Sequence, residues 1–89
     1  MERLRLTVGA SSGLHARPAA QFVQTAKRFA SKIDVFAGER QADAKSILSI
    51  LTLNVSAGAV IDLRADGDDE GQAITALRAL LESGPEVVG

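Results

Sequence analysis

Hydrophobic and polar residues alternate with a period of two in two stretches of the chain. The stretch "RLRLTV" at residues 3–8 places Leu and Val on one side and Arg and Thr on the other, as a strand with one buried face does. The stretch "AVIDLRA" at residues 59–65 alternates in the same way. Two shorter stretches, "KIDVFA" at 32–37 and "RQADA" at 40–44, flank Gly38-Glu39, which is typical of a hairpin turn. The pattern predicts four strands.

Two other stretches repeat their apolar residues at helical spacing. One runs from Pro18 to about Phe29, and the other begins near Asp68 or Asp69 and ends at Gly84-Pro85. Their apolar faces consist of Ala19, Phe22, Val23, Ala26 and Phe29 in the first helix and of Ile74, Leu77, Leu80 and Leu81 in the second. With the helix described next, the order β-α-β-β-α-β-α predicts a two-layer α+β sandwich. We expect one domain over residues 1–89.

The middle stretch, "KSILSILTLNV" at residues 45–55, has apolar residues on two sides. At ~100° per residue, Ile47, Leu48 and Leu51 cluster on one side of a helix, whereas Ile50 and Leu53 fall on another. One face then packs on the sheet and the other reaches solvent, where clustered apolar side chains commonly mark a partner site. The alternative is that the whole helix belongs to the core.

Net charge and hydropathy exclude several classes of protein. The net charge is −1 with three aromatic residues, so both the electrostatic attraction and the stacking platform of a nucleic-acid binder are absent. No apolar run approaches the ~18 residues that cross a bilayer, and the first residues lack the apolar core of a signal peptide. We therefore expect a cytoplasmic protein without membrane insertion, which agrees with the absence of cysteine.

The charges are unevenly distributed along the chain. Residues 1–45 carry eight Lys or Arg against four Asp or Glu, and residues 46–89 carry two against seven, which gives +4 and −5 and sums to −1. This predicts a basic face near His15 and an acidic far side.

The single histidine of the chain is the candidate reactive group. His15 lies in "GLHARPAAQF", shortly before a proline that marks a helix start. A helix N-terminus disfavours a protonated imidazole and favours an attached anion, and both effects suit a phosphohistidine. Backbone N–H groups of Ala16 and Arg17, the Arg17 guanidinium and the Ser12 hydroxyl are the candidate phosphate ligands. The alternative is that His15 is only a turn or capping residue.

The sequence has no complete catalytic or cofactor-binding set. One histidine without cysteine or clustered carboxylates offers too few ligands for a metal. There is no glycine-rich phosphate loop and no Ser/His/Asp or Cys/His set, so we expect no nucleotide cofactor and no stand-alone enzyme. A phosphate on His15 must therefore come from one partner and leave to another.

Three stretches together resemble one family of proteins. These are "GLHARPAAQFVQTAKRFASKI", "KSILSILTLNV" and "AVIDLRADGDDEGQAITALRALL", and they resemble the HPr family, the histidine-containing phosphocarriers of the bacterial phosphoenolpyruvate-dependent sugar phosphotransferase system. The resemblance implies an open-faced sandwich with four antiparallel strands in the order 1-4-2-3 and three helices on one face, in a monomer. It also implies that His15 takes phosphate on Nδ1 from enzyme I and passes it to IIA domains.

The resemblance also implies roles for single residues. Arg17 matches the active-site arginine, Pro18 the helix-opening proline, and Ala16 the position that supplies a backbone amide. The exposed apolar patch that docks partners is matched by Ile47, Leu48 and Leu51, together with Ala20 and Lys27 from the first helix.

Ser46 has two interpretations that can hold together. Its place before an apolar helical run is typical of an N-cap. The resemblance implies a regulatory phosphoserine made by HPr kinase/phosphorylase, with a catabolite-control regulator as a further partner. The chain departs from familiar members of the family at Ser49 and Asn54, where glycine is common, and has leucines at 48 and 51 in place of methionines.

Three alternatives for the whole chain stay open at this point. A small α+β adaptor that only binds partners has the same fold, with His15 as a plain turn residue. A nitrogen-related branch of the phosphotransferase system and a fragment of a larger fused phosphotransferase protein also agree with the sequence.

Overall fold

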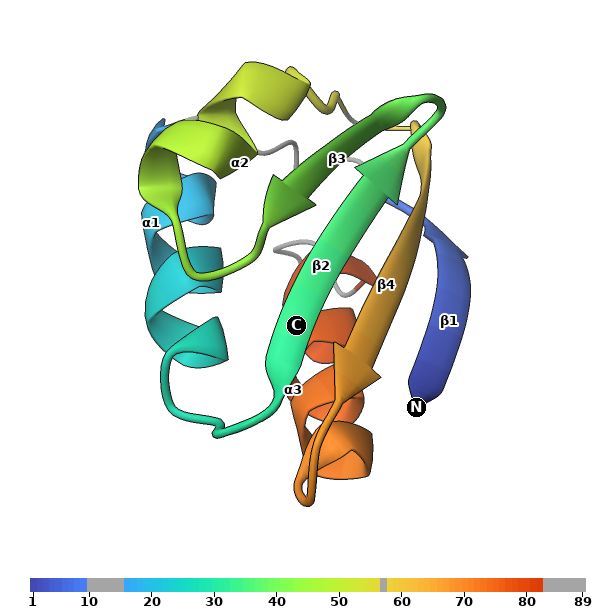
Figure 1. Cartoon of the computed structure of the whole chain (residues 1–89). Helices are drawn as coiled ribbons and strands as arrows, with labels where there is room; N and C mark the ends of the chain where they lie inside the picture. The colour runs from blue at the N-terminus through green and yellow to red at the C-terminus, as the bar shows by residue number, and fades with distance from the viewer. Residues whose placement is uncertain (10–15, 57, 83–89) are drawn as a thin grey trace, which may run out of the picture.

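Four antiparallel strands form one sheet, and the three helices of the described residues lie against one face of it (Figure 1). The computed structural model describes residues 1–9, 16–56 and 58–82, apart from the side chains of residues 16–18 and 82. The elements are β1 (Glu2–Thr7), α1 (Ala16–Ala26), β2 (Lys32–Ala37), β3 (Arg40–Asp43), α2 (Ile47–Leu53), β4 (Val60–Asp66) and α3 (Glu70–Glu82). The predicted order β-α-β-β-α-β-α and the α+β sandwich are confirmed.

The strands are arranged in the order β1-β4-β2-β3, as the family resemblance implies. Leu63 of β4 lies opposite Leu4 of β1 on one side and Val35 of β2 on the other. Because side chains alternate along a strand, this register turns one face of the sheet apolar and leaves the other polar. We call the apolar side, which the helices cover, the inner face and the other side the open face.

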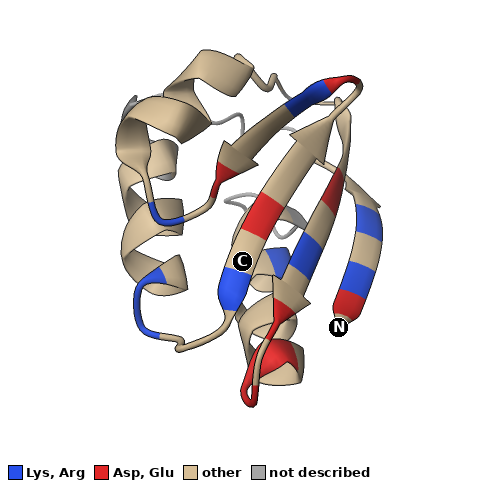
Figure 2. Ribbon diagram, viewed as in Figure 1, with Lys and Arg blue, Asp and Glu red and all other residues tan. Residues whose placement is uncertain are grey.

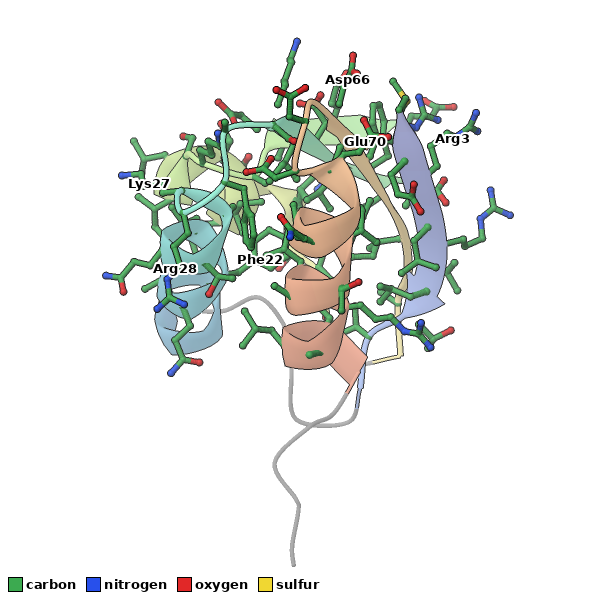
Figure 3. All side chains as sticks on the ribbon, turned by 90° about the horizontal axis from the view of Figure 1, so that it is seen from below. Arg3, Phe22, Lys27, Arg28, Asp66 and Glu70 are labelled. Carbon is green, nitrogen blue, oxygen red and sulfur yellow. The ribbon has the colours of Figure 1, made fainter. Side chains whose placement is uncertain are left out.

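The core lies between the inner face and the helices. Phe22 of α1 is fully buried, and Figure 3 shows it pointing inward, whereas Lys27 and Arg28 in the turn after α1 point outward. Ile50 of α2 and Leu77 of α3 are also fully buried. Each helix thus contributes its predicted apolar face to one shared core, which fixes how α1 and α2 lie relative to the sheet.

The predicted helix boundaries differ from the observed ones by one to three residues. The first helix was predicted to reach Phe29, but α1 ends at Ala26. Beyond it, Phe29 N–H donates to the Ala26 carbonyl, so the chain leaves the helix through a tighter turn. The last helix was predicted to begin near Asp68 or Asp69, and α3 begins one residue later, at Glu70, with the Asp69 carbonyl accepting a hydrogen bond from Ala73 N–H. Its predicted end at Gly84-Pro85 lies outside the described residues.

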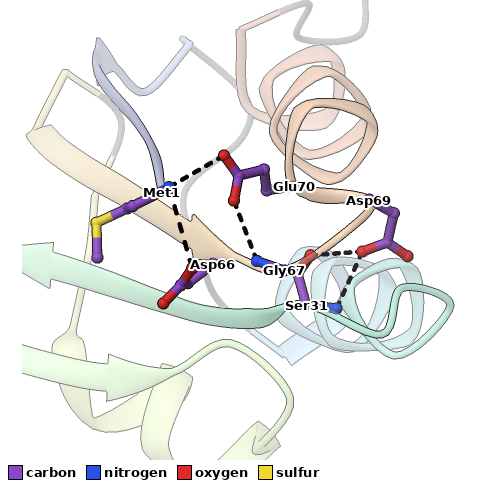
Figure 4. A network of polar contacts seen from close by, with 6 residues as sticks. All are labelled: Met1, Ser31, Asp66, Gly67, Asp69 and Glu70. Carbon is purple, nitrogen blue, oxygen red and sulfur yellow. Dashed lines mark hydrogen bonds and ion pairs between the residues drawn. The ribbon is translucent and has the colours of Figure 1, made fainter.

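Hydrogen bonds link the chain just after α1 to the turn between β4 and α3 (Figure 4). The Asp69 carboxylate accepts hydrogen bonds from the backbone N–H groups of Ala30 at 2.8 Å and Ser31 at 3.0 Å, and from the Ser31 hydroxyl. The Glu70 carboxylate accepts a hydrogen bond from Gly67 N–H at 3.1 Å and pairs with the amino group of Met1 at 3.2 Å. The Ser31 hydroxyl lowers the pKa of Asp69, and the Gly67 N–H lowers that of Glu70.

Gly67 packs closely against Ser31 at this turn, and the contact predicts the effect of a substitution on stability. A Cβ atom at Gly67 would lie 2.7 Å from Ser31 Cα and 2.5 Å from Ser31 Oγ. We expect Gly67→Ala to lower the free energy of unfolding by about 1–3 kcal/mol, because backbone must move to admit the methyl group. Gly71→Ala, where a Cβ meets nothing within 4 Å, is the control and should raise it by about 0.4–1 kcal/mol. Urea denaturation of both variants measures the difference, and equal stabilities would contradict the close contact.

Candidate functional site

The N-terminus of α1 follows directly on the predicted reactive histidine. α1 begins at Ala16, the residue after His15 in the chain, so the predicted start at Pro18 was two residues late. The first N–H groups of a helix have no partner within the helix, and the positive end of the helix dipole lies there. The structure therefore places the backbone of Ala16 and Arg17 in a helical first turn. Ser12, His15 and the Arg17 side chain lie outside the described residues, so their roles stay predictions.

Ser46 is the N-cap of α2. Its backbone is extended, with φ −119° and ψ 114°, and its hydroxyl oxygen accepts a hydrogen bond from Ser49 N–H at 3.3 Å. The Ser46 carbonyl accepts the first helical hydrogen bond, from Ile50 N–H at 3.0 Å. The capping interpretation is thus confirmed, while the regulatory one stays a prediction. Ser46 is half-buried beside the exposed residues that follow it.

α2 has one buried and one exposed apolar face, as predicted. Ile50 is 0% and Leu53 is 4% exposed, because both point to the core. On the other face Leu48 is 73%, Leu51 39% and Ile47 37% exposed. The alternative that the whole helix is core is therefore wrong. Ile47, Leu48 and Leu51 form the exposed apolar patch, and exposed apolar groups gathered in this way indicate a contact surface for another protein.

The two remaining predicted docking residues lie on α1 and in the turn after it. α1 packs against α2, and Ala20 of α1 and Lys27 of the following turn are both exposed. We call these two residues and the apolar patch the docking surface. Each predicted docking residue has the exposure that a contact residue needs, and the docking role itself stays a prediction.

Two basic residues that the sequence analysis missed hold the two ends of α2. The Lys45 ammonium donates to the Phe29 carbonyl at 2.8 Å, which ties the start of α2 to the turn after α1. At the other end, the Arg40 guanidinium donates to the Thr52 carbonyl at 3.4 Å. The sequence does contain a signal for the position of Arg40. Arg40 and Ala42 are two residues apart on β3, so both lie on the inner face of the sheet. The partners themselves are far apart in sequence and could not be predicted.

The predicted basic face is only partly correct. Arg3, Arg5 and Lys32 alternate with buried residues and therefore lie on the open face, away from the helices (Figure 2). There Arg5 Nε forms an ion pair with Asp62 at 3.0 Å, and its hydrogen bond lowers the pKa of that carboxyl. The positive charge of residues 1–45 is thus divided between the two sides of the molecule. Acidic residues gather at the turn between β4 and α3, as Figure 2 shows.

The described residues contain neither a cluster of metal ligands nor a helix that could cross a membrane. Residues 1–9, 16–56 and 58–82 hold no group of three His, Asp or Glu that could bind a metal ion. In the same ranges, no helix has both the length and the apolar character needed to cross a membrane.

The fold and this arrangement define a class of protein. A sheet in the order β1-β4-β2-β3, helices on one face only, and a lone histidine directly before α1 are the features of small histidine phosphocarriers. The family model described as "PTS HPr component phosphorylation site" matches residues 3–83. The chain belongs to the HPr family, the phosphocarriers of the phosphotransferase system.

Individual relatives agree with this assignment. The phosphocarrier protein HPr of Haemophilus influenzae is 50% identical over 72 residues, which cover 81% of this chain and 85% of that protein. A multiphosphoryl transfer protein of Xanthomonas campestris is 42% identical over 82 residues, covering 92% of this chain and 10% of that protein. The crystal structure of HPr-C-His from Thermoanaerobacter tengcongensis superposes with a TM-score of 0.91 at 47% identity, covering 99% of this chain and 100% of that one.

Proposed function

We propose that this chain accepts a phosphoryl group from phospho-enzyme I on His15 and transfers it to IIA domains of sugar permeases. The observation that carries the proposal is the start of α1 at Ala16, one residue after His15, together with an exposed apolar patch on α2, the helix that packs against α1. The first feature supplies a place for a phosphate, and the second supplies a surface on which its donor and its acceptor dock in turn.

The phosphoryl transfer needs a neutral nucleophile and stabilisation of charge. Nδ1 of the neutral His15 imidazole attacks phosphorus, and the bond between phosphorus and the donor breaks as the new P–N bond forms. The phosphate oxygens then face N–H groups of the first turn of α1, Ala16 and Arg17 among them, and the Ser12 hydroxyl. The Arg17 guanidinium balances the charge as the phosphate arrives and leaves. In the second transfer, a nucleophile of the IIA domain attacks the same phosphorus, and the P–N bond to His15 breaks as the new bond forms.

The docking surface explains how one small domain serves several partners. The apolar patch on α2 releases water when a partner covers it, which favours association. Because this effect does not depend on the direction of individual contacts, one patch can bind partners of different shape. Lys27 adds a cation near this patch and favours partners with acidic surfaces. Because enzyme I and IIA domains dock on the same surface, each must leave before the other binds.

A transfer assay tests the proposal against a binding-only adaptor. The chain is incubated with labelled phosphoenolpyruvate and purified enzyme I, and a IIA domain is then added. We expect a phosphate on the chain that is stable in base and labile in acid, as a phosphohistidine is, and its passage to the IIA domain. An adaptor would bind enzyme I without acquiring label. Running the assay with enzyme I of the sugar branch and of the nitrogen-related branch identifies which of the two the chain serves.

We further propose that phosphorylation of Ser46 regulates docking. Ser46 caps α2 directly before Ile47 and Leu48 of the docking surface. A phosphate there brings nearly two negative charges beside the apolar patch, which oppose an acidic partner, while the helix N-terminus stabilises them. HPr kinase/phosphorylase and a catabolite-control regulator are the partners this proposal adds.

Ser46→Asp should therefore raise the KM for this chain in the enzyme I reaction by roughly threefold to tenfold at low salt, with little change in maximal rate. Ser46→Asn is the matched control, because asparagine also caps a helix but adds no charge. Added salt should narrow the difference between the two variants, since exposed charges are screened over about 8–10 Å at physiological ionic strength. A defect confined to the maximal rate would instead mean that Ser46 perturbs His15, and equal KM values would leave Ser46 as a cap alone.

A further inference from the structure

Arg40 lies on an unexpected side of the sheet. Ala42 of β3 is buried on the inner face, so Arg40, two residues earlier, falls on the same side, opposite Ala37 of β2. Among the charged residues of the described strands, only Glu2 and Arg40 occupy inner-face positions. Arg40 is nevertheless exposed, because it stands at the end of the sheet beyond the core. A charged residue therefore interrupts the apolar side of β3 next to α2.

The guanidinium of Arg40 reaches the C-terminal end of α2. It donates through Nη1 to the Thr52 carbonyl at 3.4 Å. Thr52 follows Leu51 and lies one helical turn beyond Leu48, so this contact brings the guanidinium to the margin of the docking surface. The contact uses one of the five N–H donors that a guanidinium has, and the planar fork of donors fits a carboxylate.

Other described cations are less well placed for this role. Arg3, Arg5, Lys32 and Arg64 lie on the open face, where Arg64 stacks over the Phe36 ring at 4.1 Å. Lys45 directs its ammonium to the Phe29 carbonyl. α2 itself has no charged residue, as its uniform colour in Figure 2 shows. Lys27 lies in the turn after α1, and Lys45 ties this turn to the start of α2. Arg40, in contrast, supplies positive charge at the C-terminal end of α2.

We propose that Arg40 is a specificity-determining residue of the docking surface, and that its guanidinium binds a carboxylate on the partner beside the apolar contact. The proposal rests on the docking function proposed above. It fits a partner protein whose apolar contact area is bordered by Asp or Glu at the position facing the C-terminal end of α2. A charge at the rim of an interface acts on association and on its salt dependence more than on the chemical step.

The test compares two variants that lose the same charge from different faces. Arg40→Gln removes the guanidinium beside α2, and Lys32→Gln removes an exposed cation from the open face. KM and kcat of each variant are measured with phosphoenolpyruvate and enzyme I, and again in transfer to a IIA domain. For Arg40→Gln we expect a KM raised by roughly twofold to fivefold with at least one partner, the contribution of an exposed ion pair, and an unchanged kcat. Lys32→Gln should match the unmodified chain.

Two further measurements separate docking from structure. Arg40→Lys keeps the charge but loses the fork of donors, so its KM should lie between those of the unmodified chain and Arg40→Gln. Added salt should reduce the difference caused by Arg40→Gln. Equal KM values for Arg40→Gln and Lys32→Gln with both partners, or an effect on kcat alone, would overturn the proposal. If Leu48→Asp raises KM in the same assay while Arg40→Gln does not, the docking surface stands and only the role of Arg40 fails.

Discussion

His15→Ala should lose phosphoryl acceptance from enzyme I completely, since His15 is the single histidine of the chain and no other side chain replaces its nitrogen nucleophile. The variant keeps the sequence of every described element, so it should fold and still bind enzyme I. The measurement is the labelled transfer assay, with thermal unfolding and enzyme I binding as controls for folding. Residual acid-labile label on His15→Ala would contradict the assignment of the phosphorylated residue.

Arg17→Ala should give a partial defect in the same assay. In the proposed mechanism the backbone N–H groups at the start of α1 still face the phosphate, whereas a charged hydrogen bond of about 1.5–3 kcal/mol is lost. Transfer should therefore become roughly tenfold to a hundredfold slower. Arg28→Ala is the matched control, because Arg28 is an exposed arginine in the turn at the other end of α1. A transfer rate equal to that of Arg28→Ala would remove Arg17 from the mechanism.

Hydrophobic periodicity was sufficient to predict the elements and their buried faces. Burial dictates which side of a strand or helix is apolar, so Leu6, Leu63 and Leu77 could be assigned to the core from spacing alone. The two faces of α2 follow from the same principle, because Leu48 and Leu53 are five residues apart and point in different directions. Sequence periodicity thus located the exposed apolar patch as well as the core.

Contacts between distant residues could not be predicted in this way. Asp69 precedes α3 as an N-cap residue would, yet its carboxylate binds Ala30 and Ser31 of the chain after α1. Lys45 and Phe29 are likewise brought together by the packing of α1 against α2. These contacts depend on the tertiary arrangement, which local sequence does not contain. The ends of helices also depend on the tertiary arrangement. α1, for example, ends at Ala26, three residues before the predicted end at Phe29.

The departure at Asn54 has a local explanation in the structure. Asn54 ends α2 in the left-handed conformation with φ 54° and ψ 49°, and its N–H donates to the Leu51 carbonyl. Glycine adopts this conformation most readily, and asparagine is the other residue commonly found there. Asparagine in place of the family's common glycine therefore preserves the end of α2 and, with it, the orientation of the docking surface.

The opposite faces of α2 predict opposite results for the same substitution. Leu53→Asp places a carboxylate at a position that is 4% exposed, where it loses its hydration without gaining a partner. Together with the lost apolar contacts, this should lower the free energy of unfolding by about 4 kcal/mol or more, enough to unfold much of the protein. Circular dichroism and thermal unfolding measure the effect.

Leu48→Asp should leave the fold intact, because Leu48 is 73% exposed. It should nevertheless weaken the docking of enzyme I and IIA domains. The substitution removes the most exposed apolar side chain of the patch and adds a negative charge that acidic partners repel. We expect its KM with enzyme I to rise roughly tenfold, since about 1.4 kcal/mol of binding is a factor of ten. Val60→Asp makes a similar exchange at a residue that is 55% exposed on the open face, and it should leave KM unchanged. If Leu48→Asp unfolds like Leu53→Asp, α2 has no free face in solution, and if it docks as well as Val60→Asp, partners bind elsewhere on the molecule.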